Sequence, residues 1–492
     1  MFTGRSSARV LPSPFAVILS LVIGINALLL PVRVDDAWWH LRAGSELLDG
    51  GALLTRNTFS FTAPHWPWFM HEWLSEVLFA GMFRASGAWG LAVLAVALLA
   101  GTVVLGWRLL TRRADTGWAA ALCALNVAIL LQPAFSLRPW LFTHGLFAGA
   151  LLLAHSPVQR RWKLLAMAAL FSLWANLHGS FLAGLLALGA LLGGALLGRL
   201  TRRPDALEVR EAASLVVAAV AGCLASPTPL ERFIHPLQYA AASLAGQQGH
   251  LKELLSQNLE WQPPSMSSPL GWMLVGWLAL CAAVTLASRE RPEWGHVALT
   301  AIFAAMAFAS LRNIPLAALA ACPLLGQHLP EALQWWRTKH GSGPVPSSHL
   351  PVPVMVLVAC AWVLHGALPT RADLALLSPG YFPSGLLEQL ELHQPQRPYN
   401  HFDYGGAIQW ALWPRVRPFW DQRVDCYPPG VIRDGLSLHN AAPGWQEVLA
   451  RWQVDAVADR AHSALARALR TDGRWRVAWE DDESVLFLLL ER

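Results

Sequence analysis

Acidic and imidazole side chains gather in one short part of the chain. Asp35 and Asp36 are followed by His40, and the adjacent pair His71 and Glu72 comes about thirty residues later. Carboxylates and imidazoles are the groups that most often accept and donate protons in general acid–base catalysis. Their concentration within about forty residues marks this segment as a candidate site.

The stretch before this segment is long enough to cross a membrane. It is apolar from Phe15 to Leu30, and about 17 to 25 apolar residues cover the roughly 30 Å hydrocarbon core of a bilayer. Charged groups are costly beside lipid, so their presence directly after a span indicates a bundle interior or an aqueous cavity. Arg5 and Arg9 precede the stretch as in a signal peptide, but no small-x-small cleavage motif lies before Arg33, and we expect a retained helix.

Composition favours a polytopic membrane protein over a soluble enzyme. Apolar residues make up 54% of the chain and charged residues 14%, whereas soluble domains carry about 25% charged residues. The net charge of +5 comes from 34 arginines and three lysines, an imbalance that indicates codon usage, so we expect no nucleic-acid partner. Five of the six cysteines lie in apolar runs, which predicts neither a disulfide framework nor a CxxC metal site.

Hydropathy indicates about eleven membrane spans. Their approximate edges are 13–31, 88–110, 117–133, 140–155, 164–177, 180–198, 212–226, 268–288, 295–310, 313–329 and 351–369. Basic residues are enriched in cytoplasmic loops, and here they fall on the side of the N-terminus: Arg112, Arg113, Arg160, Arg161, Lys163, Arg199, Arg202, Arg203, Arg289, Arg291, Arg337 and Lys339. We therefore expect a cytoplasmic N-terminus, and an odd number of spans places the C-terminus outside. Two overlapping GxxxG patterns within 189–198 predict close helix packing.

From about residue 370, short apolar runs alternate with helical stretches, which favours a small α/β domain. The expected elements are helices near 384–392, 445–452 and 463–469, strands near 399–403, 416–420 and 454–458, a turn at Gly405-Gly406, and a hairpin of 476–479 with 485–490. The expected fold is an α-helical polytopic membrane domain over 1–369, with a first outer loop at 32–76. A C-terminal extracytoplasmic α/β domain over 370–492 follows it.

Further polar residues fall at the ends of spans, on the side opposite to the basic loops. They are Arg138, Asn176, His178, Glu260 and Arg312. Polar residues with scattered structural roles would occur on both sides, so this asymmetry indicates one outward-facing cavity. We also expect residues 35–76 to form short helices lying across its mouth.

Several motifs resemble those of the GT-C superfamily of integral membrane glycosyltransferases. Its members include the protein O-mannosyltransferases, the aminoarabinose transferase of lipid A and the catalytic subunit of oligosaccharyltransferase. The motifs are Asp36-Ala37-Trp38-Trp39-His40-Leu41-Arg42-Ala43-Gly44, Phe59-Ser60-Phe61-Thr62, His71-Glu72-Trp73-Leu74, Asn176-Leu177-His178-Gly179 and Asp421-Gln422-Arg423. They look like those of a bacterial group of that type, and the resemblance covers nearly the whole chain.

The resemblance implies transfer of a sugar from a polyprenyl-phosphate-linked donor to a glycan, lipid or protein acceptor, on the outer face of a bacterial inner membrane. Such a transfer needs a base for the acceptor hydroxyl and cations or hydrogen-bond donors for the departing phosphate. The resemblance assigns the role of the base to Asp36, because the acidic residue of the family lies two positions before the tryptophan pair, as Asp36 does before Trp38. Asp35 is its close rival.

The resemblance also supplies candidate substrate contacts. Arg138, Arg312 and His178 are expected near the lipid phosphate, and His71 with Glu72 near the acceptor or a metal ion. The remaining expected substrate-binding residues are His40, Asn176 and Glu260. In some relatives a divalent cation assists, but no spacing here demands a metal, so the cofactor stays open.

Structural roles remain open for the acidic motif. Asp35 and Asp36 can cap the following helix, a position that acidic residues favour. Trp38 and Trp39 can belong to an aromatic belt at the membrane surface. His71-Glu72-Trp73-Leu74-Ser75 lacks the second histidine of a metalloprotease helix, which excludes that class.

The other candidates have structural alternatives too. Arg138 and Arg312 can extend to the membrane surface from helix ends, and His178 can satisfy backbone groups in its turn. Asp421 and Arg423 follow an expected strand, where a structural ion pair competes with a ligand contact.

Two other functions remain open: a flippase for a lipid-linked precursor, and an inactive GT-C-like scaffold. A flippase needs polar groups deep in the bundle, and most of the spans are apolar throughout.

Overall fold

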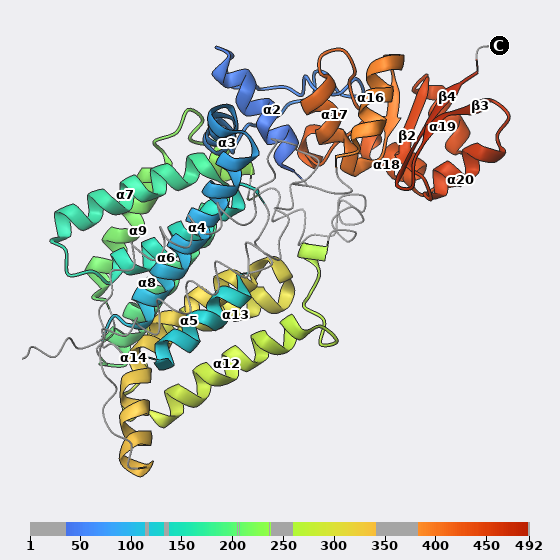
Figure 1. The fold of residues 1–492 in the computed structure, drawn as a ribbon. Coiled ribbons are helices and arrows are strands. Elements are labelled where there is room, and N and C mark those ends of the chain that lie inside the picture. Colours follow the sequence, from blue (N-terminus) through green and yellow to red (C-terminus); the bar gives the residue numbers. More distant parts are fainter. Residues whose placement is uncertain are drawn as a thin grey trace, which may run out of the picture.

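The computed structural model describes residues 36–113, 118–131, 137–203, 205, 207–235, 237, 259–340 and 382–490. Helices predominate in these residues, and a small four-stranded sheet lies near the C-terminus (Figure 1). The spans expected at 13–31 and 351–369 and the candidate Asp35 lie outside the described residues.

Each of the other expected spans coincides with a helix. These helices are α4 (Ala88–Leu110), α5 (Trp118–Leu130), α6 (Trp140–Ala154), α7 (Arg160–Leu177), α8 (Phe181–Leu200), α9 (Val209–Cys223), α12 (Pro269–Ala287), α13 (Trp294–Ala309) and α14 (Ile314–His340). Within the described residues, segments of three helices are long and apolar enough to cross a membrane: Val93–Leu110, Phe181–Leu200 and Pro269–Ala287. Helix α14 continues about eleven residues beyond the expected span.

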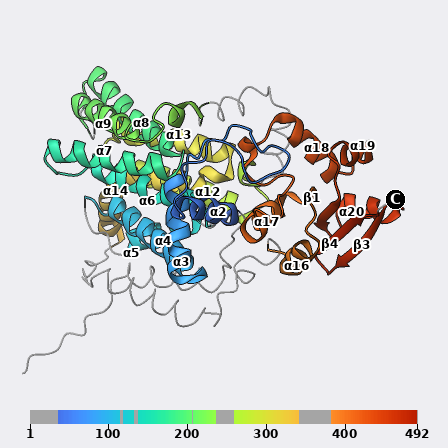
Figure 2. The same ribbon diagram turned by 90° about the horizontal axis from the view of Figure 1, so that it is seen from above.

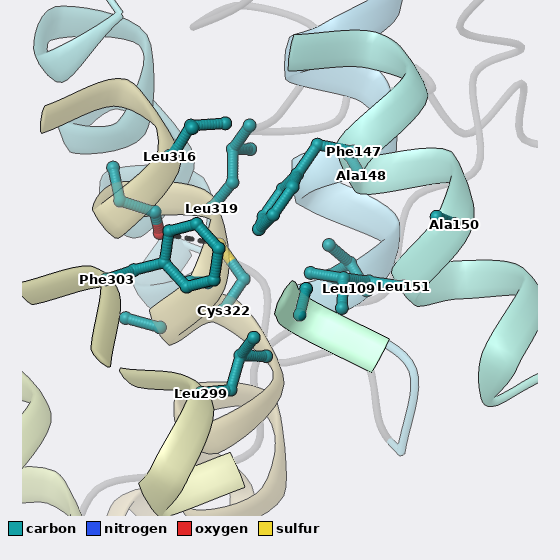
Figure 3. Packing of buried hydrophobic residues seen from close by; sticks show 14 of the residues in the cluster. Leu109, Phe147, Ala148, Ala150, Leu151, Leu299, Phe303, Leu316, Leu319 and Cys322 are labelled. Atoms are coloured by element: carbon teal, nitrogen blue, oxygen red, sulfur yellow. Dashed lines mark hydrogen bonds between the residues drawn. The ribbon is translucent and has the colours of Figure 1, made fainter. Parts of the chain in front are cut away.

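The helical bundle packs around one apolar core. Phe147, Leu151, Phe303 and Leu319 lie in it with exposures of zero, and Figure 3 shows them converging from α6, α13 and α14. The thiol of Cys322 donates to the carbonyl of Ala318 at 3.3 Å, so this buried polar group is satisfied within its own helix. The candidate polar residues lie outside this core, at the ends of the helices.

The 35–76 segment differs from its expected form. Helices α2 (Ala37–Leu48) and α3 (Trp73–Ser86) pack against each other, but the part between them, the 49–72 segment, forms no helix. It packs instead against the C-terminal domain, because its apolar side chains Phe59, Trp68 and Met70 are buried there.

The expected exposure of α2 was also wrong. A helix lying across the mouth of an aqueous cavity would turn its polar side chains towards water, but His40 is 2% exposed. The belt interpretation of Trp38 and Trp39 fails as well, since both side chains are buried in the protein, at 0% and 7% exposure. The cause is tertiary: α2 lies between α3 and helix α17 (Gly405–Leu412) of the C-terminal domain (Figures 1 and 2).

The C-terminal domain has a mixed sheet with strand order β1-β2-β4-β3. Strands β1 (Pro398–Asn400) and β2 (Ala456–Arg460) are parallel, and β4 (Ser484–Leu489) is antiparallel to both β2 and β3 (Trp475–Glu480). The helices and 3-10 turns are α16 (Ser384–His393), η5 (Phe402–Tyr404), α17, η6 (Val424–Cys426), α18 (Pro429–His439), α19 (Trp445–Arg451) and α20 (Ala464–Thr471).

Two local expectations for this domain were wrong. The strand expected at 416–420 does not form, because the buried side chain of Asn400 binds the backbone groups that a strand would need. The N–H of Phe419 donates to Oδ1 of Asn400 at 2.8 Å, and Nδ2 of Asn400 donates to the carbonyl of Trp420 at 3.0 Å. The turn expected at Gly405-Gly406 is the start of α17. Gly405 is needed there for close packing, since a Cβ would lie 2.2 Å from the Trp420 carbonyl oxygen. Helix α18 was not expected.

The GxxxG patterns are only partly used for packing. A Cβ on Gly194 would lie 2.1 Å from the backbone nitrogen of Gly295 in α13, and one on Gly198 would lie 2.9 Å from the Arg203 carbonyl oxygen. A Cβ on Gly189 or on Gly193 would meet nothing within 4 Å. Close contact of α8 with α13 therefore depends on Gly194.

We predict that Gly194→Ala destabilises the bundle and that Gly193→Ala does not. The first adds a methyl group against a rigid backbone, and overpacking of this kind costs about 1–3 kcal/mol. The second adds the same atom in open space and gains roughly 0.5–1 kcal/mol of helix stability. The measurement is reversible unfolding of the purified protein in mixed micelles, and an equal effect of the two changes would contradict the α8–α13 contact.

Candidate active site

The candidate residues meet where the bundle adjoins the C-terminal domain. Helices α2 and α3 lie at that end of the bundle in both ribbon views (Figures 1 and 2). The start of α6, the end of α7, and the 3-10 turns η2 (Leu259–Trp261) and η3 (Leu311–Asn313) reach the same place, as the contacts below show. Segments far apart in the sequence therefore contribute to one polar cluster.

Asp36 forms an ion pair with Arg138. The Nε of Arg138 lies 2.8 Å from Oδ2 of Asp36, and the same guanidinium also binds Glu260. Asp36 occupies the N-cap position of α2, but its side chain makes no capping hydrogen bond. The capping interpretation of Asp36 is therefore wrong, and Arg138 pairs inside the protein instead of extending to lipid.

Glu72 lies among three imidazoles. Its Oε1 is 3.0 Å from Nε2 of His178 and 3.5 Å from Nε2 of His71, and its Oε2 is 3.7 Å from Nε2 of His40. The side chain of Glu72 is only 10% exposed. One carboxylate thus joins α2, the start of α3 and the turn after α7.

The hydrogen bonds of His178 define its tautomer. The backbone N–H of Ser180 donates to Nδ1 at 2.9 Å, so Nδ1 is an acceptor. The proton therefore resides on Nε2, which donates to Glu72. His178 satisfies a backbone group, as its structural interpretation proposed, and in addition it orients a carboxylate of the cluster.

A second carboxylate, Glu76, lies one helical turn after Glu72 and was not expected. It is 1% exposed, and its Oε1 is 3.4 Å from Nδ1 of His40. Its (i, i+4) spacing from Glu72 would place both groups on one face of a helix. That spacing was the signal available in the sequence.

Burial and neighbouring charges set different ionisation for the two glutamates. Burial alone would raise the pKa of Glu72, but His71 and His178 hold it well below its usual range. Burial raises the pKa of Glu76, and the hydrogen bond from His40 only partly opposes this. Glu72 is therefore the fixed anion of the cluster, and Glu76 favours its neutral form.

The two histidines beside Glu72 are also opposite in charge state. Burial alone would lower the pKa of His71, but Glu72 raises it to about 9. Burial lowers the pKa of His178 to about 3, and Glu72 offsets only part of that effect. At neutral pH, His71 is a cation that balances Glu72, and His178 is a neutral donor.

Burial raises the pKa of Asp36 as well, and the charge of Arg138 opposes this increase. A carboxylate that is partly desolvated and held by one arginine is a stronger base than one in water. The geometry thus allows Asp36 to accept a proton.

Arg312 lies between two indole rings. Its guanidinium carbon is 4.4 Å from the ring centre of Trp140 and 4.9 Å from that of Trp261. Trp140 in turn contacts His178, with ring centres 5.3 Å apart. Within the described part of the chain, the N–H groups of Arg312 have no protein acceptor, so they are available to an anion.

Asn176 is occupied by contacts within the protein. Its Oδ1 accepts from Nε1 of Trp73 at 2.9 Å, and its Nδ2 donates to the carbonyls of Ser172 at 2.8 Å and Ala225 at 3.1 Å. The side chain therefore links α3 to the ends of α7 and α9. The structure brings Asn176 to the cluster without leaving its amide free.

Asp421 and Arg423 form a buried ion pair, with Nη2 of Arg423 2.7 Å from Oδ2 of Asp421. The guanidinium also lies over the rings of Trp39, Phe59 and Trp68, at 5.8, 5.0 and 4.6 Å. This geometry supports the structural interpretation, since the pair joins the C-terminal domain to α2 and the 49–72 segment.

A group with metal-ligand chemistry was expected only in part, since His71 was a candidate beside a metal ion but His235 and Asp425 were not. His71, His235 and Asp425 each present one ligand atom, and these atoms lie within 4.8 Å of one another. The three residues lie on segments far apart in the chain, so no local spacing pattern could reveal them.

Comparison with known proteins finds similarity in structure only. No protein-family model matches the chain. No curated protein matches it in sequence. Among solved structures, ArnT from Cupriavidus metallidurans in the apo state is similar over 96% of each chain, with a TM-score of 0.52 and 14% identity. The chain has an ArnT-like fold.

Two further structures agree with this result. ArnT bound to undecaprenyl phosphate matches 96% of this chain and 97% of its own, with a TM-score of 0.50 and 13% identity. The archaeal oligosaccharyltransferase AglB from Archaeoglobus fulgidus, in complex with an inhibitory peptide and a dolichol-phosphate, matches 91% of this chain and 69% of its own, with a TM-score of 0.51 and 12% identity. These likenesses establish the fold of this chain, in which three of the described helices are long and apolar enough to cross a membrane.

We predict different effects of neutralising the two buried glutamates. Glu72→Gln leaves the His71 cation without its balancing charge, and breaking a buried pair costs about 3 kcal/mol of the free energy of unfolding. Glu76→Gln should cost less than about 1 kcal/mol, because its pKa shift already favours a neutral group at that position. Unfolding in mixed micelles at pH 7 measures both.

The pH dependence has a definite sign. A depressed carboxylate pKa contributes stability above the unfolded value, which for Glu72 is 4.5. The difference between wild type and Glu72→Gln should therefore be complete at pH 7 and shrink as the pH falls below about 4.5. A difference that persists unchanged at pH 3 would contradict the assigned charge of Glu72.

Proposed function

We propose that this protein is a glycosyltransferase that moves a sugar from a polyprenyl-phosphate-linked donor to an acceptor hydroxyl, with Asp36 as the base. The observation that carries this proposal is the pairing of Asp36 with Arg138 at 2.8 Å. This ion pair belongs to a chain whose fold is similar to that of ArnT, and ArnT has a solved structure bound to undecaprenyl phosphate. A carboxylate oriented by a cation fits the removal of a proton from an acceptor.

The donor phosphate would bind beside this pair. Arg312 offers a guanidinium that is fixed by two indole rings and free of protein acceptors in the described residues. Arginine suits phosphate because its planar fork of N–H groups matches the phosphate oxygens. In this proposal Arg312 holds the charge that grows on the departing phosphate, and Arg138 orients the base.

The proposed location is the outer face of a bacterial inner membrane. Arg113 pairs with Glu290 and Glu293, and Lys163 pairs with Glu211, at helix ends opposite to the candidate cluster. Basic residues concentrated at one end favour a cytoplasmic location for that end. The candidate cluster and the C-terminal domain would then be extracytoplasmic.

We predict that Asp36→Asn lowers the rate of glycan transfer by about 10²–10⁴-fold while the protein remains folded, because loss of a general base has an effect of that size. The matched control is Asp49→Asn at the other end of the same helix, which removes only an exposed ion pair with Arg84 and should leave transfer unchanged. The assay is transfer from a polyprenyl-phosphate-linked sugar in membranes of a deletion strain.

The same assay includes Asp35→Asn. Loss of transfer in that variant alone would move the base to Asp35. Full transfer by both variants would remove the base assignment and favour the inactive scaffold.

We predict that Arg312→Gln weakens binding of undecaprenyl phosphate about 10- to 100-fold, since a hydrogen bond to a charged group is worth about 1.5–3 kcal/mol. Arg312→Lys should retain part of the affinity, because the charge is kept and the fork is lost. Arg291→Gln, at the opposite end of the bundle, is the control. Native mass spectrometry of the purified protein measures the bound lipid, and equal binding by all variants would refute the phosphate role.

A further inference from the structure

Three side chains from distant segments converge beside Glu72, in the polar cluster described above. His71 precedes α3, His235 follows α9, and Asp425 lies in η6 of the C-terminal domain. Nε2 of His235 is 3.1 Å from Oδ2 of Asp425, and the imidazole rings of His71 and His235 have centres 4.8 Å apart. All three are half-buried, so the group is neither a surface cluster nor sealed from ions in solution.

The donor set has a recognisable metal preference. Imidazole nitrogens suit zinc and other first-row transition ions, whereas magnesium and calcium prefer oxygen ligands alone. Two histidines with one carboxylate form a set that zinc sites use repeatedly. A second carboxylate adjoins the group, since Oε1 of Glu72 lies 3.5 Å from Nε2 of His71.

The orientation of His71 supports a ligand role. Its Nδ1 lies 3.2 Å from the carbonyl oxygen of Phe69, which can only accept, so Nδ1 carries a proton. Nε2 is the ligand atom, and because His71 is a cation in the ion-free protein, a bound ion displaces the Nε2 proton to solvent. Metal-binding histidines commonly donate their other N–H to a backbone carbonyl, which fixes the tautomer and the ring.

The backbone at this position is also fixed. Arg232 donates to the carbonyl of His71 and, at 2.6 Å, to that of Ala175, and its guanidinium lies over the ring of Phe69 at 5.4 Å. These contacts hold the His71 backbone against the end of α7. A ligand on a fixed backbone needs little reorganisation to bind an ion.

We propose that His71, His235 and Asp425 bind one zinc-type divalent ion, and that this ion fixes the C-terminal domain to the bundle. Bonds of about 2.0–2.1 Å in a tetrahedral site place ligand atoms roughly 3.4 Å apart. The present spacing of up to 4.8 Å therefore closes by side-chain rotation. Because the ligands come from three segments, the bound ion links the 49–72 segment, the segment that follows α9, and η6. This role does not depend on the proposed transfer reaction.

The test uses the full-length protein in detergent, stripped with a chelator and titrated with zinc. We expect about one equivalent of zinc in the wild type by elemental analysis and calorimetry. His235→Gln and Asp425→Asn should each weaken binding at least tenfold, as loss of a ligand does. Magnesium should compete poorly. The exposed residues His462 and Asp482 provide matched controls, and the His462→Gln, Asp482→Asn double variant should bind zinc as the wild type does.

Hydrogen exchange gives a second readout that requires no catalysis. Zinc should slow amide hydrogen exchange in residues 69–72 and 424–426 of the wild type. In the Asp425→Asn protein, zinc should leave the exchange rates of these residues unchanged. Equal melting of all proteins in chelator would show that the variants fold. The proposal is overturned if the wild type binds no more zinc than the Asp425→Asn protein, in which case the three groups form an ion-pair cluster only. Zinc binding by an Asp36→Asn protein without transfer would separate this inference from the proposed function.

Discussion

The buried carboxylate of Glu72 constrains the whole site. An anion with 10% side-chain exposure is stable only if neighbouring groups replace water, and His40, His71 and His178 do so from three different segments. Their positions therefore depend on one another: α2, the start of α3 and the turn after α7 must meet for Glu72 to remain charged. Asp36 lies one turn before His40 on α2, so the placement of the proposed base follows from this constraint.

A second buried charge ties the C-terminal domain to the same helix. Arg423 is 2% exposed and is held by Asp421 on one side and by Trp39, Phe59 and Trp68 on the other. Removing either partner of a buried pair leaves an uncompensated charge, which is costly. The domain is thus part of the support of the site, and motion of one without the other would expose this ion pair.

The arrangement divides acid–base and anion-binding chemistry between neighbours. Asp36 is oriented by Arg138, which also binds Glu260, while Arg312 lies against aromatic rings without a protein acceptor among the described residues. An arginine already neutralised by two carboxylates is a poor phosphate ligand, whereas one fixed only by indole rings retains its donors. This difference, and not the number of arginines, separates the proposed roles of Arg138 and Arg312.

The sequence by itself predicted the helices α4 to α9 and α12 to α14, and it named most of the residues that the structure brings together in the polar cluster. Helix α4 has the bounds of the expected span, because a long apolar run forms a helix for local reasons. Only the tertiary structure decided that His40 is buried, that Asn400 replaces the strand expected at 416–420, and that Asp425 joins His71. Each of these depends on a partner far away in the chain. Periodicity and hydropathy describe neighbours in sequence, whereas the burial of a charge depends on neighbours in space.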